Sequence, residues 1–383
     1  MKKALYTSTV LAAAGVLAFS ATDSQAKAKK MSMSLSGSMT SMMGWSKQDS
    51  AFESTASSTA RVHYDAFNLV NDSEIHFKGK TKLDNGVAID VVLQLETDQS
   101  IHLERLNGGR TIDESYVRLS GGFGDIRIGT TKATNFTMSG GAPGAGAVGV
   151  GGAAEDWFII RPSAMAGALN FPGTNDGAGD DMRIVYYTPK FNGFQVGATY
   201  TPSSADQNMP AAVGGTAGTE QQKYDLTAAY NGKMGTTTVK LGAGYVINQG
   251  AAANSTKTWN LSGRVGFGGW EVGAAYRERD DTDTTSAGAV QNANAKTVYQ
   301  TGISYKSGPF KLGLSYMGAD TPQTAAVPGS DTLSSISLGG QYNVGPGVDL
   351  KGSILRVSWE DELTNDANNN DGWAVIGGIT VGF

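Results

Sequence analysis

The segment between Thr130 and Arg183 carries the residues of this sequence best suited to steering charged or polar molecules. It opens with flexible glycine and alanine and then holds five carboxylates, which are Glu155, Asp156, Asp176, Asp180 and Asp181. Structureless loops longer than about 15 residues are usually functional or disordered. Because a purely solvated loop would seldom contain Trp157, Phe158 and two isoleucines together, we expect residues 131–182 to fold inward. Trp157 and Phe158 would then anchor the loop on a wall while the carboxylates point into the remaining opening; an outward lid is the alternative.

Three patterns that could indicate an enzyme are absent or lack the surrounding residues that such a site needs. Gly144 to Gly149 matches the dinucleotide fingerprint by letter, but it lies in a Gly/Ala-rich loop without the strand, helix and acidic residue that such a site needs. Three histidines and no cysteine provide no zinc constellation. The sequence has no Gly-x-Ser-x-Gly elbow and no local grouping of histidine, serine and acid. We therefore expect no catalytic site, no resident metal and no cofactor.

One acidic stretch, Asp366 to Gly372, resembles the start of a calcium-binding loop. The EF-hand spacing fails because Gly372 comes one place late and Gly377 stands where a bidentate glutamate is required. A solvated polar loop is the default interpretation, and loosely bound calcium is the alternative.

The elements that would position these residues are short strands with alternating side chains. Between Ser73 and Leu83, for example, apolar residues face one side and histidine and lysines face the other. Asn231-Gly232 predicts one of the tight turns, since Asn-Gly readily supplies positive φ angles. We count sixteen strands, with short turns only after even-numbered strands and longer loops only after odd-numbered ones. Antiparallel strands that cross a bilayer require that asymmetry, with short turns on the periplasmic side.

The two faces of these strands differ in chemistry. One face is apolar and often ends in an aromatic residue, such as Tyr245 or Phe267, as expected at a lipid headgroup boundary. The other face is small or charged and includes Lys240 and Arg264. A sandwich would bury such charges at a cost of several kcal/mol each, whereas a barrel of sixteen strands is wide enough to hold water. The sequence therefore predicts an all-β fold, a sixteen-stranded antiparallel transmembrane β-barrel with long extracellular loops.

Residues 1–26 have the features of a cleaved secretory signal peptide. Lys2 and Lys3 precede an apolar run that is too short to span a bilayer, and Ser24-Gln25-Ala26 provides a small-residue cleavage site. Residues 27–383 would then form one barrel. Removing this segment from 30 basic and 35 acidic residues leaves 28 and 34, a net charge of −6, which argues against a nucleic-acid partner.

Several stretches together resemble the general diffusion porins of Gram-negative outer membranes. Ile75 to Glu96 is similar to the family's early hairpin, and Tyr116 to Gly129 is similar to the hairpin before its third loop. Ile184 to Phe194 matches the strand that follows that loop, and the terminal Phe383 matches the family's assembly signal. The resemblance covers essentially the whole of residues 27–383.

The resemblance implies a homotrimer in the bacterial outer membrane, beside lipid and lipopolysaccharide and inserted by the barrel assembly machinery. In this family, acids on an inward third loop face a basic cluster on the opposite wall. The matching basic candidates, all inward by alternation, are Lys78, Lys80, Arg118 and Arg127. The chain departs from the family at Asp113 and Thr130, where arginine is common. Alternatively, the lysines belong to an ordinary hydrated wall near the periplasmic mouth.

The expected function is a water-filled channel for passive diffusion of ions and small hydrophilic solutes. The inward acids and the lost arginine positions predict a mild preference for cations. Two alternatives stay open. One is a substrate-specific channel in which Trp157 and Phe158 form a greasy or sugar-stacking track; the other is a structural or adhesion protein with a plugged barrel.

Overall fold

The computed structural model describes residues 31–53, 64–96, 112–151, 153–162, 165, 181–203, 220–250, 255–281, 297–322, 329–362 and 368–383. Within these ranges the chain forms a short helix, α2 (Thr134–Met138), a 3₁₀ turn, η1 (Ala153–Trp157), and sixteen strands. The strands are β1 (Ser32–Lys47), β2 (Phe67–Lys82), β3 (Ala88–Glu96), β4 (Ile112–Gly121), β5 (Gly124–Thr130), β6 (Met182–Tyr187), β7 (Phe194–Thr201), β8 (Glu220–Met234), β9 (Thr237–Gly250), β10 (Ser255–Phe267), β11 (Trp270–Asp281), β12 (Thr297–Ser307), β13 (Phe310–Pro322), β14 (Ser330–Gly345), β15 (Val348–Glu360) and β16 (Asn370–Gly382). The proposed signal segment 1–26 lies outside the described residues, as do Asp176 and Asp180.

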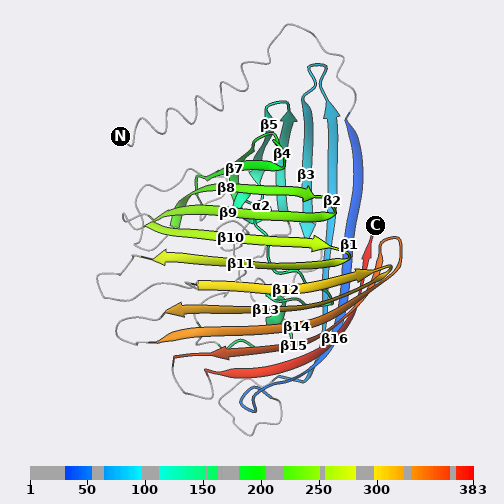
Figure 1. Cartoon of the computed structure of the whole chain (residues 1–383), viewed down its shortest axis with the longest axis vertical. Helices are drawn as coiled ribbons and strands as arrows, with labels where there is room; N and C mark the ends of the chain where they lie inside the picture. Colours follow the sequence, from blue (N-terminus) through cyan, green and yellow to red (C-terminus); the bar gives the residue numbers. More distant parts are fainter. Residues whose placement is uncertain are drawn as a thin grey trace.

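The sheet closes on itself. Each strand pairs antiparallel with its neighbours in sequence, and β1 pairs with β16. At this seam the N–H of Phe383 donates to the carbonyl of Gly37 (3.0 Å), and the N–H of Gly37 donates back (2.8 Å). Figure 1 shows β8–β13 crossing the direction of β1–β3 steeply, as tilted strands on opposite walls of a barrel do. The predicted all-β, sixteen-stranded antiparallel barrel is confirmed.

The barrel has an apolar outer face and a polar inner face, the reverse of a soluble fold. On β9, Leu241 and Tyr245 point outward and are 51% and 43% exposed, whereas Asn248 points inward and is buried. Outward aromatic rings pair across strands near the strand ends, as with Trp270 and Tyr305, whose centroids lie 4.6 Å apart. Among the described residues, no helix is both long and apolar enough to cross a membrane.

The connection between β8 and β9 differs from the sequence prediction. The predicted turn at Asn231-Gly232 is wrong, because β8 continues to Met234 and the turn falls on the next two residues. The N–H of Asn231 donates to the carbonyl of Gly193 (2.8 Å), which ties this position to the neighbouring hairpin. Gly235 then supplies the positive φ, +62°, that the turn requires. Pairing with adjacent strands therefore overrides the local preference of Asn-Gly for a turn.

Candidate functional site

The segment between β5 and β6 is called here the constriction loop. A buried ion pair holds the base of this loop, where it joins the two strands. Arg183 is 2% exposed and donates to the carbonyl of Thr131 and to the carboxylate of Asp181, both at 2.8 Å. The carboxylate of Glu114 on β4 accepts from the hydroxyl of Thr131 and the N–H of Lys132, both at 3.0 Å. These bonds direct the chain into the lumen at the level where β5 ends. Asp181, a predicted constriction acid, is thus part of the loop's base.

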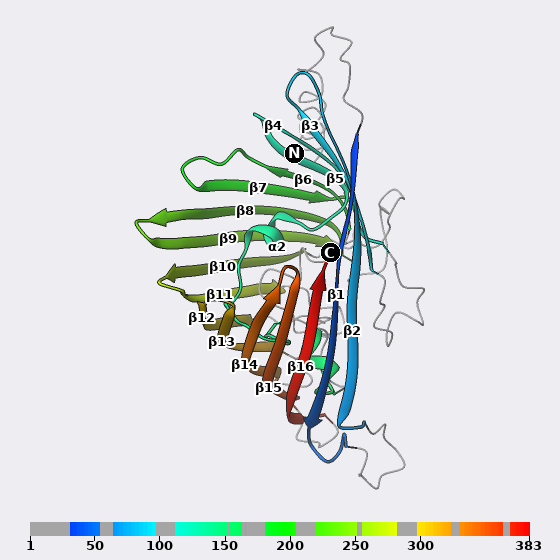
Figure 2. The same ribbon diagram turned by 90° about the vertical axis from the view of Figure 1, so that its right-hand side faces the viewer.

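Helix α2 lies against the inner wall formed by β7–β9. The carboxylate of Asp225 on β8 accepts from the N–H of Asn135 (2.7 Å) and the hydroxyl of Thr134 (2.9 Å). The side-chain amide of Asn135 donates to Asn260 on β10 (2.8 Å). Figure 2 shows α2 inside the ring of strands, between β8–β9 and β1. The predicted inward course of the loop therefore begins with a helix held by a wall carboxylate.

The Gly/Ala-rich part of the loop lies on inward-facing wall glycines. A Cβ atom added to Gly313 on β13 would lie 2.6 Å from the backbone nitrogen of Ala145. Cβ atoms at Gly302 on β12 and Gly339 on β14 would come still closer to the carbonyl oxygens of Pro143 and Ala145. Glycine inside a strand marks such close backbone approaches. The wall and the loop therefore fit together because these wall positions have no side chains and the loop residues that meet them are small.

Polar wall side chains bind the backbone of the same part of the loop. The side-chain oxygen of Gln300 accepts from the N–H of Ala142 (3.1 Å). The hydroxyl oxygen of Ser353 accepts from the N–H groups of Ala147 (2.9 Å) and Val148 (3.1 Å). Buried backbone groups need such partners. The loop thus follows the wall across β12–β15 with these three N–H groups paired to wall side chains.

The aromatic residues predicted as anchors lie at the far end of this path, against β16, β1 and β2. Phe158 and Ile159 are 3% and 0% exposed, and Phe158 packs directly over Gly44 on β1. Trp157 is half-buried against the same apolar cluster, and its carbonyl accepts from the side-chain amide of Asn68 (2.6 Å). The loop is consequently held at its start, along the wall, and again at Trp157 and Phe158.

Of the two described acids in η1, Glu155 does not project into the opening, whereas the side chain of Asp156 is 31% exposed. Glu155 is 2% exposed, and its carboxylate accepts from the N–H of Gly151 at 2.6 Å, which closes the turn. Burial raises the pKa of Glu155 to about 8, although the bond from Gly151 opposes the shift. Burial also raises the pKa of Asp156, against the opposing influence of Arg161, whose nearest nitrogen lies 3.7 Å away. From Ser139 to Gly151 the loop contains no charged residue.

The predicted basic wall contains an arginine pair whose charge is compensated by carboxylates on β3 and β5. Arg118 and Arg127 lie directly opposite each other on β4 and β5. Arg118 pairs with Asp125 and with Asp90 (2.9 Å), and Arg127 lies 3.5 Å from Asp125. The Arg127 guanidinium also lies 4.9 Å from the ring centroid of Tyr187. Alternation could have indicated these carboxylates, because both fall on the inward face of their strands.

Lys78 and Lys80 follow each other on the lumen face of β2, and both are exposed. Among the described residues, neither has a carboxylate oxygen within 4.0 Å of its ammonium nitrogen. The structure therefore brings the four basic residues onto neighbouring strands. The arginines are ion-paired and the lysines carry the exposed positive charge.

Two described residues of the calcium-like stretch, Asn370 and Asp371, already have protein partners. Asn370 accepts from the N–H of Asp49 (3.1 Å) and donates to Gln48 (2.9 Å), and Asp371 pairs with Arg356 (2.8 Å). These side chains of Asn370 and Asp371 are committed to the protein, whereas Asp366 lies outside the described residues. Elsewhere among the described residues, Glu74, Glu96 and Asp113 bring carboxylate oxygens within 4.8 Å of one another in the outer part of the lumen.

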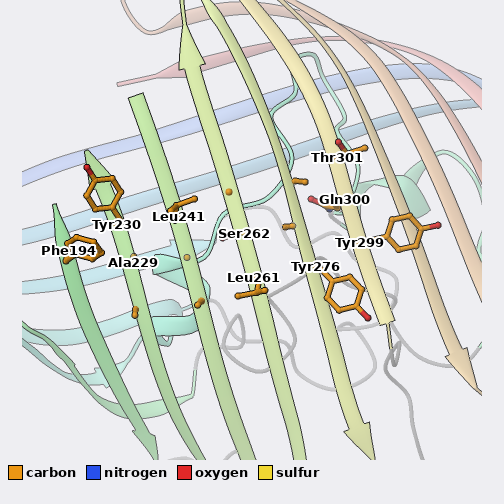
Figure 3. A pocket seen from close by; sticks show the side chains of 16 residues that line it. Phe194, Ala229, Tyr230, Leu241, Leu261, Ser262, Tyr276, Tyr299, Gln300 and Thr301 are labelled. Atoms are coloured by element: carbon orange, nitrogen blue, oxygen red, sulfur yellow. The ribbon is translucent and has the colours of Figure 1, made fainter. Parts of the chain in front are cut away.

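A separate groove of about 740 Å³ lies on the barrel wall across β8–β12 (Figure 3). Small residues including Ala228, Ala243 and Gly263 form its floor, between larger side chains such as Leu241 and Tyr276. These residues belong to the outward face of their strands, so the groove is not part of the lumen.

A closed barrel that is apolar outside and polar inside, with a long loop fixed along its inner wall, is the architecture of an outer-membrane pore. Residues 7–361 match the family model described as Gram-negative porin, so the chain belongs to the Gram-negative porin family. It is accordingly an outer-membrane porin channel and not an enzyme.

Relatives of this chain are distant in sequence. A monosaccharide porin from Halomonas sp and the major outer membrane protein of Halomonas elongata are each 21% identical over 349 residues, covering 82% of this chain and 83% of theirs. Among solved structures, an anion-selective porin from Comamonas acidovorans has a TM-score of 0.60 at 20% identity, covering 92% of this chain and all of that one. The trimer form of OmpT from Vibrio cholerae has a TM-score of 0.58 at 13% identity, covering 93% of this chain and all of that one. At these identities the structural matches show the shared fold.

Proposed function

We propose that this porin admits ions and small hydrophilic solutes by passive diffusion, with the constriction loop as its sieve. The supporting observation is the course of the loop. Its described residues follow the inner wall from β5 to β1 and are bonded there by Asp225, Gln300 and Ser353. These described residues lie along the wall rather than across the lumen, which favours a pore over a plugged structural barrel. Single-channel recording in a planar bilayer tests this, and the absence of conductance from folded protein would overturn it.

We further propose a homotrimer in the outer membrane, among lipid and lipopolysaccharide, inserted by the barrel assembly machinery after removal of residues 1–26. Porin homologues form trimers, and the Vibrio cholerae OmpT fold match is a trimer form. Phe383, the proposed assembly signal, is 65% exposed beside the seam and is therefore accessible to a partner.

The proposal includes the mild cation preference expected from the sequence. Its support is the acidic outer part of the lumen, where Glu74, Glu96 and Asp113 lie close together. Such a cluster attracts cations at the extracellular entrance. The reversal potential under a KCl gradient measures the preference, and a sign corresponding to chloride would overturn this part of the proposal.

A second candidate is a substrate-specific channel, favoured by the monosaccharide porin among the relatives. The geometry gives it less support, because Phe158 is buried and leaves only Trp157 for a sugar-stacking track. Blockade of the current by a monosaccharide at low concentration would favour this candidate over general diffusion.

A further inference from the structure

The lumen face of β2 changes from acidic to basic along the strand. Its inward residues, from the extracellular to the periplasmic end, are Asp72, Glu74, His76, Lys78, Lys80 and Lys82. From Glu74 to Lys82 the strand covers about 26 Å. The separation exceeds the screening length of about 10 Å at 0.1 M salt, so the two ends are electrically distinct at that concentration.

Other strands place lysines in the same periplasmic half. We use the name lysine zone for the inward lysines near the short turns, which are Lys78, Lys80, Lys82, Lys233, Lys240, Lys306, Lys311 and Lys351. Lys306 lies directly opposite Lys311, which is followed across the strands by Gln341 and Lys351. Like charges directly opposite each other destabilise a sheet. A row of this kind is therefore a position where a mobile anion would be stabilised.

Carboxylates in the periplasmic half mostly serve other groups. Asp90 and Asp125 pair with Arg118, and Glu271 lies 3.9 Å from Arg264. Asp349 accepts from the side-chain amide of Asn343 at 2.9 Å. Over the part of the chain that the structure describes, no member of the lysine zone has a carboxylate within 4.0 Å. The zone therefore keeps an excess of positive charge.

The opposite sign prevails near the extracellular ends of β2–β4. We use the name outer acidic zone for the carboxylates found there, which are Asp72, Glu74, Glu96, Asp113 and Glu114. Lys132 lies 3.4 Å from Asp113 in this zone, and the imidazole of His76 lies 2.9 Å from the carboxylate of Glu74. Arg183 pairs with Asp181, and Arg277 and Arg279 on β11 are buried rather than lumen-exposed.

We propose that this lumen is divided along its axis into an outer acidic zone and a periplasmic lysine zone, and that the division makes the open pore rectify ion current. The lysine zone is then the specificity determinant for anionic solutes. This inference rests on the proposed diffusion function. Cations enter readily through the acidic end and anions through the basic end. When the extracellular side is positive, both species move toward the junction and accumulate, so conductance rises; at the opposite polarity both are depleted.

Current–voltage curves of inserted channels in KCl test the proposal. At 0.1 M, where charges act over about 10 Å, we expect currents at equal and opposite voltages to differ by about two-fold, and at 1 M, with a 3 Å screening length, to be nearly equal. Adding the protein to one side of the bilayer gives the inserted channels one orientation. Protease added to the other side checks this orientation.

The variant Lys306→Gln/Lys311→Gln/Lys351→Gln, which removes three lysines of the zone, should reduce the asymmetry and shift the reversal potential toward cations. Lys190→Gln is the control, because it removes a positive charge from an exposed periplasmic turn outside the lumen. Symmetric currents at 0.1 M, or asymmetry that is undiminished in the triple variant, would overturn the division of the lumen. Protein that folds but does not conduct would instead overturn the proposed diffusion function.

Discussion

Replacing Gly313 by alanine should push the constriction loop away from the wall. The new Cβ would lie 2.6 Å from the backbone nitrogen of Ala145, and the facing atoms are backbone, which cannot rotate aside. Restoring ordinary contact, at about 3.5 Å, requires the loop to move by roughly 1 Å toward the lumen. Overpacking of this kind typically costs 1–3 kcal/mol. We therefore expect lower single-channel conductance and a smaller exclusion limit for neutral sugars in liposome swelling.

The control for this experiment is Gly377→Ala on β16, where a Cβ would have no neighbour within 4 Å. It makes the same chemical change on the outward side of the barrel and should leave conductance unchanged. A double variant, Gly313→Ala/Gly339→Ala, should lower conductance further, because both positions contact Ala145. If the Gly313 variants folded with the conductance of the parent, the loop would not be the sieve.

Two further perturbations address the charges of the site. Burial holds the pKa of Glu155 at about 8 against an ordinary 4.5, so the folded loop keeps a proton that the unfolded chain loses. The stability that this group contributes is present below pH 4.5 and falls as pH rises toward 8. Glu155→Gln should therefore flatten the dependence of the melting temperature on pH across that window. An unchanged slope of melting temperature against pH would contradict the burial argument. Arg118→Gln would leave Asp90 and Asp125 less compensated, so the reversal potential should move toward cations, with Lys190→Gln as the unchanged reference.

The sequence alone determined the architecture of this protein. Side chains alternate with a period of two, which the chain geometry itself fixes, so apolar and charged faces can be assigned without knowing any partner strand. The regular alternation of short turns and long loops also indicated which end of each strand faces the periplasm. Lys78, Lys80, Arg118 and Arg127 were placed on the lumen face by the same alternation, and the structure has them there.

The path of the constriction loop required the tertiary structure. Gly302, Gly313 and Gly339 read as weak strand positions in sequence, and only the barrel shows that their missing side chains make room for the loop. In the sequence, Glu155 looks like an acid that would face the lumen. In the structure it is buried, because it closes a turn with Gly151. Asn231 likewise lost its turn to a bond with the adjacent hairpin. Each outcome depends on contacts between residues far apart in the chain, which strand register and barrel curvature set, whereas alternation is a local property that every strand expresses by itself.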